Sequence, residues 1–123
     1  MADTLDFQLL ELMARHTGQL WVPYVETDAE HRYLRVERHG RLHDDVWKIH
    51  DGGFGRFHYG QCRFVLERDD SETWEDYQAA TLRPLAEAWS QAEAIAAELR
   101  LEYENRVARW AAQDEKNRSE AHP

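Results

Sequence analysis

The last third of the sequence carries an apolar pattern that is too long for the compact fold expected of this chain. From Leu82 to Trp110, apolar residues recur at spacings of three and four, with one interruption at Arg106. This spacing predicts an amphipathic helix from about 82 to 113, which is about 48 Å long at 1.5 Å per residue. A compact chain of 123 residues has a radius of gyration of about 14 Å. The second half of the helix is therefore expected to project from the fold.

The segment from 19 to 68 shows the alternation that is typical of β-strands. Leu34 and Val36 share one face of such a strand, as a period of two requires. Pro23 has no N–H to donate to a neighbouring strand, which predicts an edge strand or a bulge at that point. We expect this segment to form an antiparallel meander of three or four strands.

Glycines mark the turns of the predicted meander. Asp51 and Gly52 match a two-residue type I′ turn, which needs positive φ at both positions. The strand after this turn is expected to run from 57 to 66, with a bulge or bend near Gly60 because its apolar face changes there.

Two shorter helices complete the predicted fold. The pattern over 4–17 predicts an N-terminal helix, and Asp70 or Ser71 is expected to cap a short helix around Trp74 and Tyr77. The expected fold class is α+β: a helix, a three- to four-stranded antiparallel meander, a short helix and a long C-terminal helix. Residues 1–113 are expected to form one domain with a projecting helix, and 114–123 a frayed polar tail.

Composition narrows the cellular setting. There is one cysteine, which cannot form an internal disulfide, and no apolar run long enough for a membrane span. The first residues lack the basic and apolar regions of a secretion signal. These features predict a cytoplasmic protein with no membrane contact.

Charge is distributed unevenly along the chain, whose net charge is -9. Residues 31–68 contain eight Lys or Arg and five Asp or Glu, whereas the flanking segments contain seven and nineteen. A mildly cationic sheet is therefore expected beside strongly acidic helices, and each part suggests a different partner.

The acidic helix suggests a non-enzymatic protein that acts by protein–protein interaction. Regularly spaced carboxylates imitate a nucleic-acid backbone, so the partner is expected to be a nucleic-acid-binding protein, inhibited as phage anti-CRISPR and other DNA-mimic proteins inhibit theirs. This comparison rests on size, charge and missing chemistry. A homodimer through the same helix is an alternative. The expected contact residues are Glu87, Glu93, Glu98, Glu102, Tyr103, Val107 and Trp110.

The cationic sheet suggests a second function, the binding of single-stranded nucleic acid. Aromatic side chains stack on unpaired bases, and arginines contact the phosphates. The residues expected to do so are Arg32, Tyr33, Arg35, Arg56 and Tyr59. The same aromatics are equally suited to a hydrophobic core, and the net charge opposes a polyanionic partner.

Catalytic motifs are missing from the sequence. It contains no paired CxxC, HExxH, GxSxG or phosphate-binding loop, so no metal, cofactor or catalytic residue is expected. His58 and Cys62, four residues apart in one predicted strand, are the remaining alternative for a small enzyme or metal site.

Overall fold

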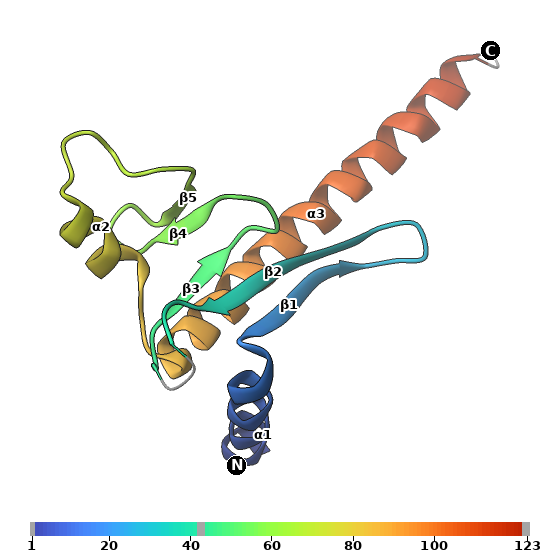
Figure 1. Cartoon of the computed structure of the whole chain (residues 1–123). Helices are drawn as coiled ribbons and strands as arrows, with labels where there is room; N and C mark the ends of the chain where they lie inside the picture. Colours follow the sequence, from blue (N-terminus) through green and yellow to red (C-terminus); the bar gives the residue numbers. More distant parts are fainter. Residues whose placement is uncertain (1, 42–43, 122–123) are drawn as a thin grey trace.

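The computed structural model describes residues 2–41 and 44–121. It confirms the α+β class and the expected order of elements, with five strands instead of three or four (Figure 1). The elements are α1 (Ala2–Thr17), β1 (Gln19–Glu26), β2 (His31–Arg38), β3 (Trp47–His50), β4 (Arg56–His58), β5 (Arg63–Val65), α2 (Trp74–Thr81) and α3 (Leu85–Ala121).

The sheet is an antiparallel meander with the strand order β1-β2-β3-β4-β5. β1 is an edge strand, and its register with β2 shifts between Pro23 and Val25. The predicted bulge is thus confirmed, because the proline cannot donate to the ladder.

Two turn predictions are partly wrong: the bend expected near Gly60 is present, but it reverses the chain, and the β3–β4 turn is longer than expected. The predicted strand from 57 to 66 is divided into β4 and β5, because the chain reverses through a turn in which Cys62 adopts φ 54°. The link from β3 to β4 spans 51–55 rather than two residues. Gly52 has the expected positive φ of 95°, but Asp51 does not, and its side chain accepts hydrogen bonds from the Gly53 and Gly55 N–H groups.

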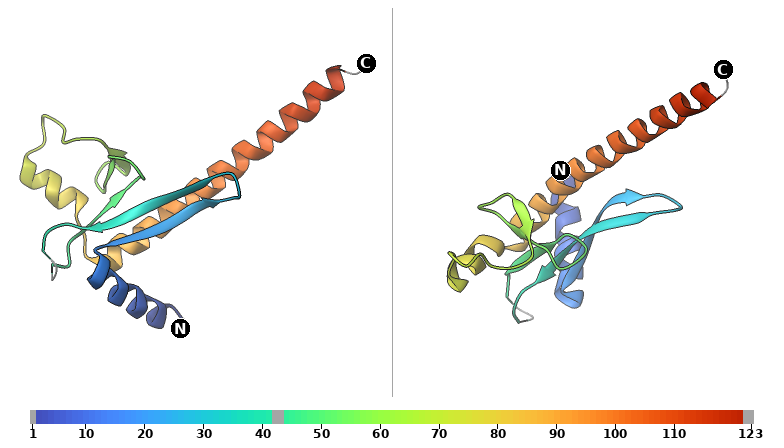
Figure 2. Two further views of the ribbon diagram at one scale, coloured as in Figure 1. Left: turned by 45° about the vertical axis from the view of Figure 1, so that its right-hand side comes forward. Right: turned by 90° about the horizontal axis from the view of Figure 1, so that it is seen from above.

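The hydrophobic core lies between the sheet and the first half of α3 (Figure 2). Leu34, Val36 and Ile49 are fully buried on the face that α3 covers, and Ala88 and Ala92 face them from the helix. Small alanine side chains let the helix approach the sheet closely. Truncation of a buried leucine such as Leu34 to alanine typically costs about 2–5 kcal/mol.

The ends of α2 and α3 differ from the predicted ones. α2 is capped by Thr73, whose hydroxyl accepts the Asp76 N–H at 3.1 Å, and not by Asp70 or Ser71. Arg83 pairs with Trp47 as an isolated β-bridge, so α3 begins only at Leu85, directly after Pro84. α3 continues to Ala121, past the expected end at 113; residues 122 and 123 of the expected tail lie outside the described residues.

α1 and the second half of α3 extend away from the sheet (Figures 1 and 2). In α1, Ala14 is buried and its carbonyl accepts a hydrogen bond from Arg38, whereas Leu9, Leu12 and Met13 are exposed. Within the described ranges, no helix combines the length and the apolar character needed to cross a membrane.

Candidate functional site

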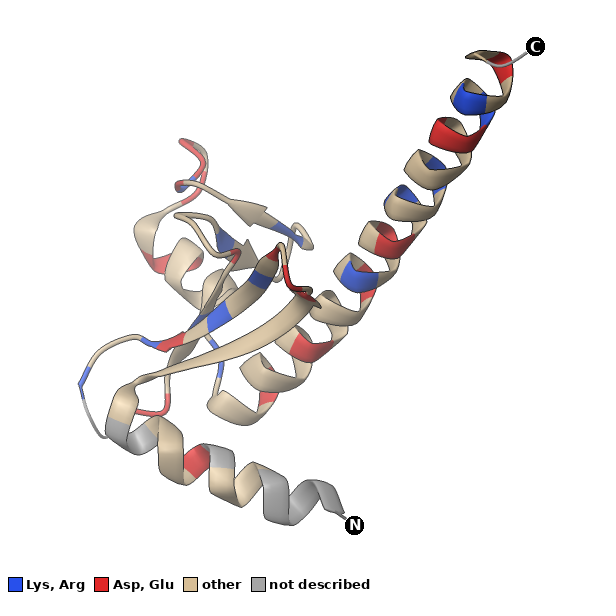
Figure 3. Cartoon of the chain, turned by 90° about the vertical axis from the view of Figure 1, so that its right-hand side faces the viewer, with Lys and Arg blue, Asp and Glu red and all other residues tan. Residues whose placement is uncertain are grey.

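Acidic residues recur along α3 where the helix crosses the sheet (Figure 3). The predicted contact residues Glu87, Glu93, Glu98 and Glu102 are all exposed. Glu87 lies 3.7 Å from Arg83, but no ion pair joins the other three to any residue that the structure describes. At 3.6 residues per turn, Glu87, Glu98 and Glu102 share one flank of the helix and Glu93 lies on the other. The carboxylates therefore border the helix on both sides instead of forming one line.

The covered part of α3 ends at the tip of the β1–β2 hairpin. Arg100 donates a hydrogen bond to the Pro23 carbonyl at 2.9 Å, and the Tyr103 hydroxyl donates to Glu30 at 3.1 Å. Tyr103 is thus half-buried at the boundary and belongs to the body of the fold. Every residue from 104 to 121 is exposed, including Val107 and the 60% exposed Trp110.

The opposite face of the sheet carries a row of side chains that crosses all five strands. Register pairs link Trp21 to Arg35, Arg35 to His50, His50 to Arg56 and Arg56 to Val65. Neighbouring strands are about 4.8 Å apart, so Arg35 and Arg56 stand about 10 Å apart with His50 between them. We call Arg35, His50, Arg56 and the neighbouring Lys48 the cationic cluster.

One carboxylate, that of Glu37, faces the cationic cluster. Its oxygen lies 3.8 Å from Arg35 and 3.2 Å from His50, yet neither ring nitrogen of His50 has a hydrogen bond. His50 is only 9% exposed. Burial lowers its pKa, and Arg35 and Lys48 lower it further, which keeps the imidazole neutral near pH 7.

The other members of the cluster, Lys48 and Arg56, also lie close to like charges. Burial and the nearby Arg56 charge lower the pKa of Lys48, for which the structure shows no ion-pair partner among the described residues. Arg56 is anchored differently: its guanidinium donates to the Thr81 hydroxyl at 3.2 Å and lies over the Tyr77 ring. Cations are therefore concentrated on this face with little compensating charge.

The structure divides the predicted nucleic-acid-binding residues. Tyr33, Arg35 and Arg56 lie on the face of the sheet opposite α3, but the Arg56 guanidinium is turned to Thr81 and Tyr77 of α2. Arg32 instead pairs with Glu30 and lies over the Tyr103 ring. Tyr59 lies beneath the Arg83 guanidinium, and burial raises the pKa of its hydroxyl to about 12.

Sequence reasoning placed neither Trp21 nor His50 at a site. The missing information was the register: Trp21 lies opposite Arg35, and His50 lies between Arg35 and Arg56. Asp51 and Gly52 marked the β3–β4 turn, and a five-residue loop there aligns His50 with Arg56.

His58 and Cys62 do not form a reactive pair. His58 Nδ1 accepts the Gln61 N–H at 3.0 Å, so Nε2 carries the proton and donates to Glu72 at 2.8 Å. Both ring nitrogens are occupied by structural contacts. Cys62 is exposed in the turn, with its thiol directed to the Tyr59 carbonyl.

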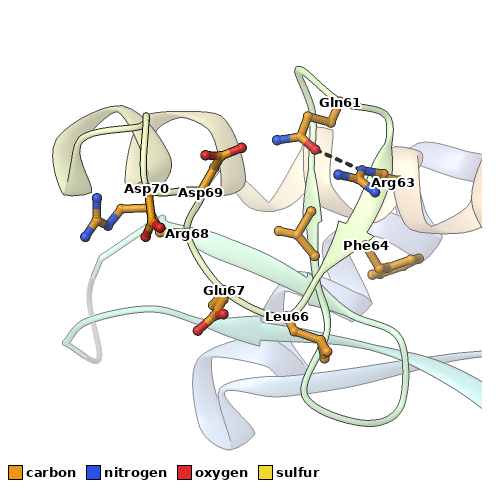
Figure 4. A pocket seen from close by; sticks show the side chains of 9 residues that line it. Gln61, Arg63, Phe64, Leu66, Glu67, Arg68, Asp69 and Asp70 are labelled. Atoms are coloured by element: carbon orange, nitrogen blue, oxygen red, sulfur yellow. Dashed lines mark hydrogen bonds between the residues drawn. The ribbon is translucent and has the colours of Figure 1, made fainter.

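A shallow pocket of about 470 Å³ lies between β5 and the following loop (Figure 4). Arg63 is held by Gln61 at 2.8 Å, and the Asp69 carboxylate is occupied by the backbone and hydroxyl of Ser71. These hydrogen bonds lower the pKa of Asp69. The charged groups stand apart around the opening and do not converge on one point.

No group of three or more His, Cys, Asp or Glu side chains is arranged to hold a metal ion within the part of the chain that the structure describes. Comparisons with protein-family models, curated proteins and solved structures find no match to this chain. The functions of the acidic flanks of α3 and of the cationic cluster are therefore inferred from their residues and geometry.

Proposed function

We propose that this is a non-enzymatic protein that acts by binding another protein through α3. The observation that supports the proposal is the exposed segment 104–121, which is about 27 Å long at 1.5 Å per residue. In proteins most helical stability comes from packing of an apolar face, and within this chain every residue of the segment is exposed. A partner that packs against the segment supplies the missing stabilisation.

The apolar stripe of α3 continues into this segment. Ala92, Ala96 and Leu99 pack on the sheet, and the same three-four spacing leads on to Val107 and Trp110, which face solvent. Tryptophan is among the residues that most often dominate the binding energy of protein interfaces. The sheet thus covers the first half of the apolar stripe, and the proposed partner protein would cover the second half.

Charge favours a cationic partner over a second copy of the chain. Segment 104–121 contains four basic and four acidic residues, whereas Glu93, Glu98 and Glu102 beside it are unpaired among the described residues. Two copies would place these carboxylates against one another, which is unfavourable. A nucleic-acid-binding protein offers the opposite charge. If the acidic helix occupied the nucleic-acid site of such a protein, it would inhibit nucleic-acid binding.

The test is affinity capture from nuclease-treated lysate of the source cells, followed by titration of the purified candidate. We expect Val107→Gln with Trp110→Gln to weaken binding at least tenfold, since interface tryptophans often contribute more than 2 kcal/mol. The triple variant Glu93→Lys, Glu98→Lys, Glu102→Lys is expected to weaken it further at low salt. Competing DNA should release the partner.

The matched control is Asp28→Lys, Glu67→Lys, Asp70→Lys, which changes the charge equally at exposed loop positions. Equal loss of binding in this control would show that only net charge matters and would refute the α3 site. Light scattering after gel filtration checks the competing occupant: a stable dimer that dissociates in the Val107 and Trp110 variant would replace the heteromeric proposal with self-association.

A further inference from the structure

We propose that the open face of the sheet binds single-stranded nucleic acid, with the cationic cluster on phosphates and Trp21 and Tyr33 on bases. This site lies on the face opposite α3 and does not depend on the function proposed for that helix. Its basis is the register that aligns Arg35, His50 and Arg56 across three adjacent strands.

Unbalanced charge is the first argument for a bound anion. Arg35, Lys48 and Arg56 face one carboxylate, Glu37, so two positive charges are uncompensated even with His50 neutral. Packing like charges on a half-buried surface destabilises a fold unless something offsets it. Two successive backbone phosphates of a single strand, each with one negative charge, would offset both positive charges.

Unsatisfied donors at the same place are the second argument. His50 is only 9% exposed, and neither ring nitrogen has a hydrogen bond, although a Glu37 oxygen lies 3.2 Å from Nε2. The Arg35 Nε is also buried without an acceptor. Buried polar atoms are normally paired in folded proteins. Phosphate oxygens would supply acceptors for the Arg35 Nε–H and for the single N–H of the neutral His50 ring.

The adjoining aromatic pair identifies the anion as part of a nucleic acid. Trp21 is the neighbour of Arg35 in the row, and Tyr33 is one position further along the open face. Their rings meet edge to face at a centroid distance of 6.5 Å, and both are nearly half exposed. Exposed rings beside cations stack on unpaired bases, which a duplex does not offer.

The net charge of -9 does not prevent this binding, because the acid is on other surfaces. α3, which carries many of the acidic residues, lies on the face of the sheet opposite the cluster (Figure 2). At physiological salt, charges more than about 8 Å apart in solvent are largely screened.

The test uses the full chain, purified free of nucleic acid, with fluorescein-labelled oligothymidine in an anisotropy titration. Arg35→Gln with Lys48→Gln is expected to weaken binding at least tenfold and to reduce the slope of log K against log salt by about 1.4, the value for two lost phosphate contacts on a single strand. Trp21→Ala is expected to weaken binding at least about fivefold through lost stacking.

The matched control is Arg109→Gln with Lys116→Gln, an equal charge change on the exposed end of α3, and circular dichroism checks that each variant is folded. No binding of the oligonucleotide, or equal weakening by the control, would refute the site. If inorganic phosphate abolished oligonucleotide binding and Trp21→Ala left it unchanged, the ligand of the site would be free phosphate and not nucleic acid. The α3 charge variant should lose its protein partner yet keep oligonucleotide binding, so the two proposals fail separately.

Discussion

At the scale of single residues, the turn from β3 to β4 is held by the Asp51 side chain instead of forming the predicted two-residue type I′ turn. Asp51 Oδ1 accepts the N–H groups of Gly53 and Gly55 at 3.0 and 3.2 Å. A Cβ on Gly52 would lie 3.2 Å from the Tyr33 carbonyl oxygen, and Gly52 has positive φ. Gly53 has neither restriction.

We expect Gly52→Ala to lower the free energy of unfolding by about 1 kcal/mol more than Gly53→Ala, because alanine resists positive φ. Urea unfolding of both variants measures the difference. Equal effects would mean that the loop relaxes to another conformation at little cost.

His50 gives the stability a dependence on pH. Burial and the charges of Arg35 and Lys48 hold its pKa below 6.5, while Glu37 opposes them. The unfolded chain therefore takes up the proton first, so stability is retained above the ordinary histidine pKa and falls as the pH drops through the lowered one. We expect His50→Gln to show a smaller loss of stability than wild type between about pH 7.5 and 5.5.

The exposed His31 provides the matched control for loss of one histidine, and the His31→Gln and His50→Gln curves are measured side by side. If His50→Gln lost stability as steeply as wild type, the acid sensitivity would have to come from other groups.

At the scale of elements, the sequence predicted what local patterns determine. The order of elements, the Pro23 bulge and the core face of Leu34 and Val36 follow from short-range spacing and are confirmed. The start of α3 could not be predicted, because it depends on a β-bridge between Trp47 and Arg83, which are far apart in the sequence.

The candidate sites show the same limit. The acidic residues of α3 were predictable as exposed positions of an amphipathic helix. The cationic cluster was only half predictable. Arg35 and Arg56 were expected to act together, but Arg32 pairs with Glu30 instead. His50 belongs to the cluster because the strand register places it between Arg35 and Arg56. Side-chain contacts across strands depend on loop lengths that composition does not reveal.

Hydrogen exchange should divide α3 into two parts. Residues 88–99 pack on the sheet, so their amides open only when most of the fold opens, whereas residues 105–121 bury nothing. We expect peptides from the second part to exchange at least a hundredfold faster, as measured by mass spectrometry. Equal protection along the helix would show that another chain covers the segment in solution.

At the scale of the whole molecule, the sheet separates two surfaces of opposite charge, one of them on α3. The carboxylates of α3 border the helix on both flanks, and the cationic cluster lies on the face of the sheet opposite the helix. The two proposed sites, for a protein on α3 and for nucleic acid on the opposite face of the sheet, would lie on opposite sides of the molecule. The sheet thickness then sets the distance between them.

The long helix also governs how the molecule turns in solution. α3 extends well past the sheet, so rotation about its axis meets less friction than end-over-end rotation (Figure 1). Its N–H bonds lie along that axis, whereas those of β1 and β2 lie across strands that run in roughly the same direction. Nuclear spin relaxation should therefore give higher R2/R1 ratios for residues 88–99 than for the strands, and a partner that rounds off the particle should remove the difference.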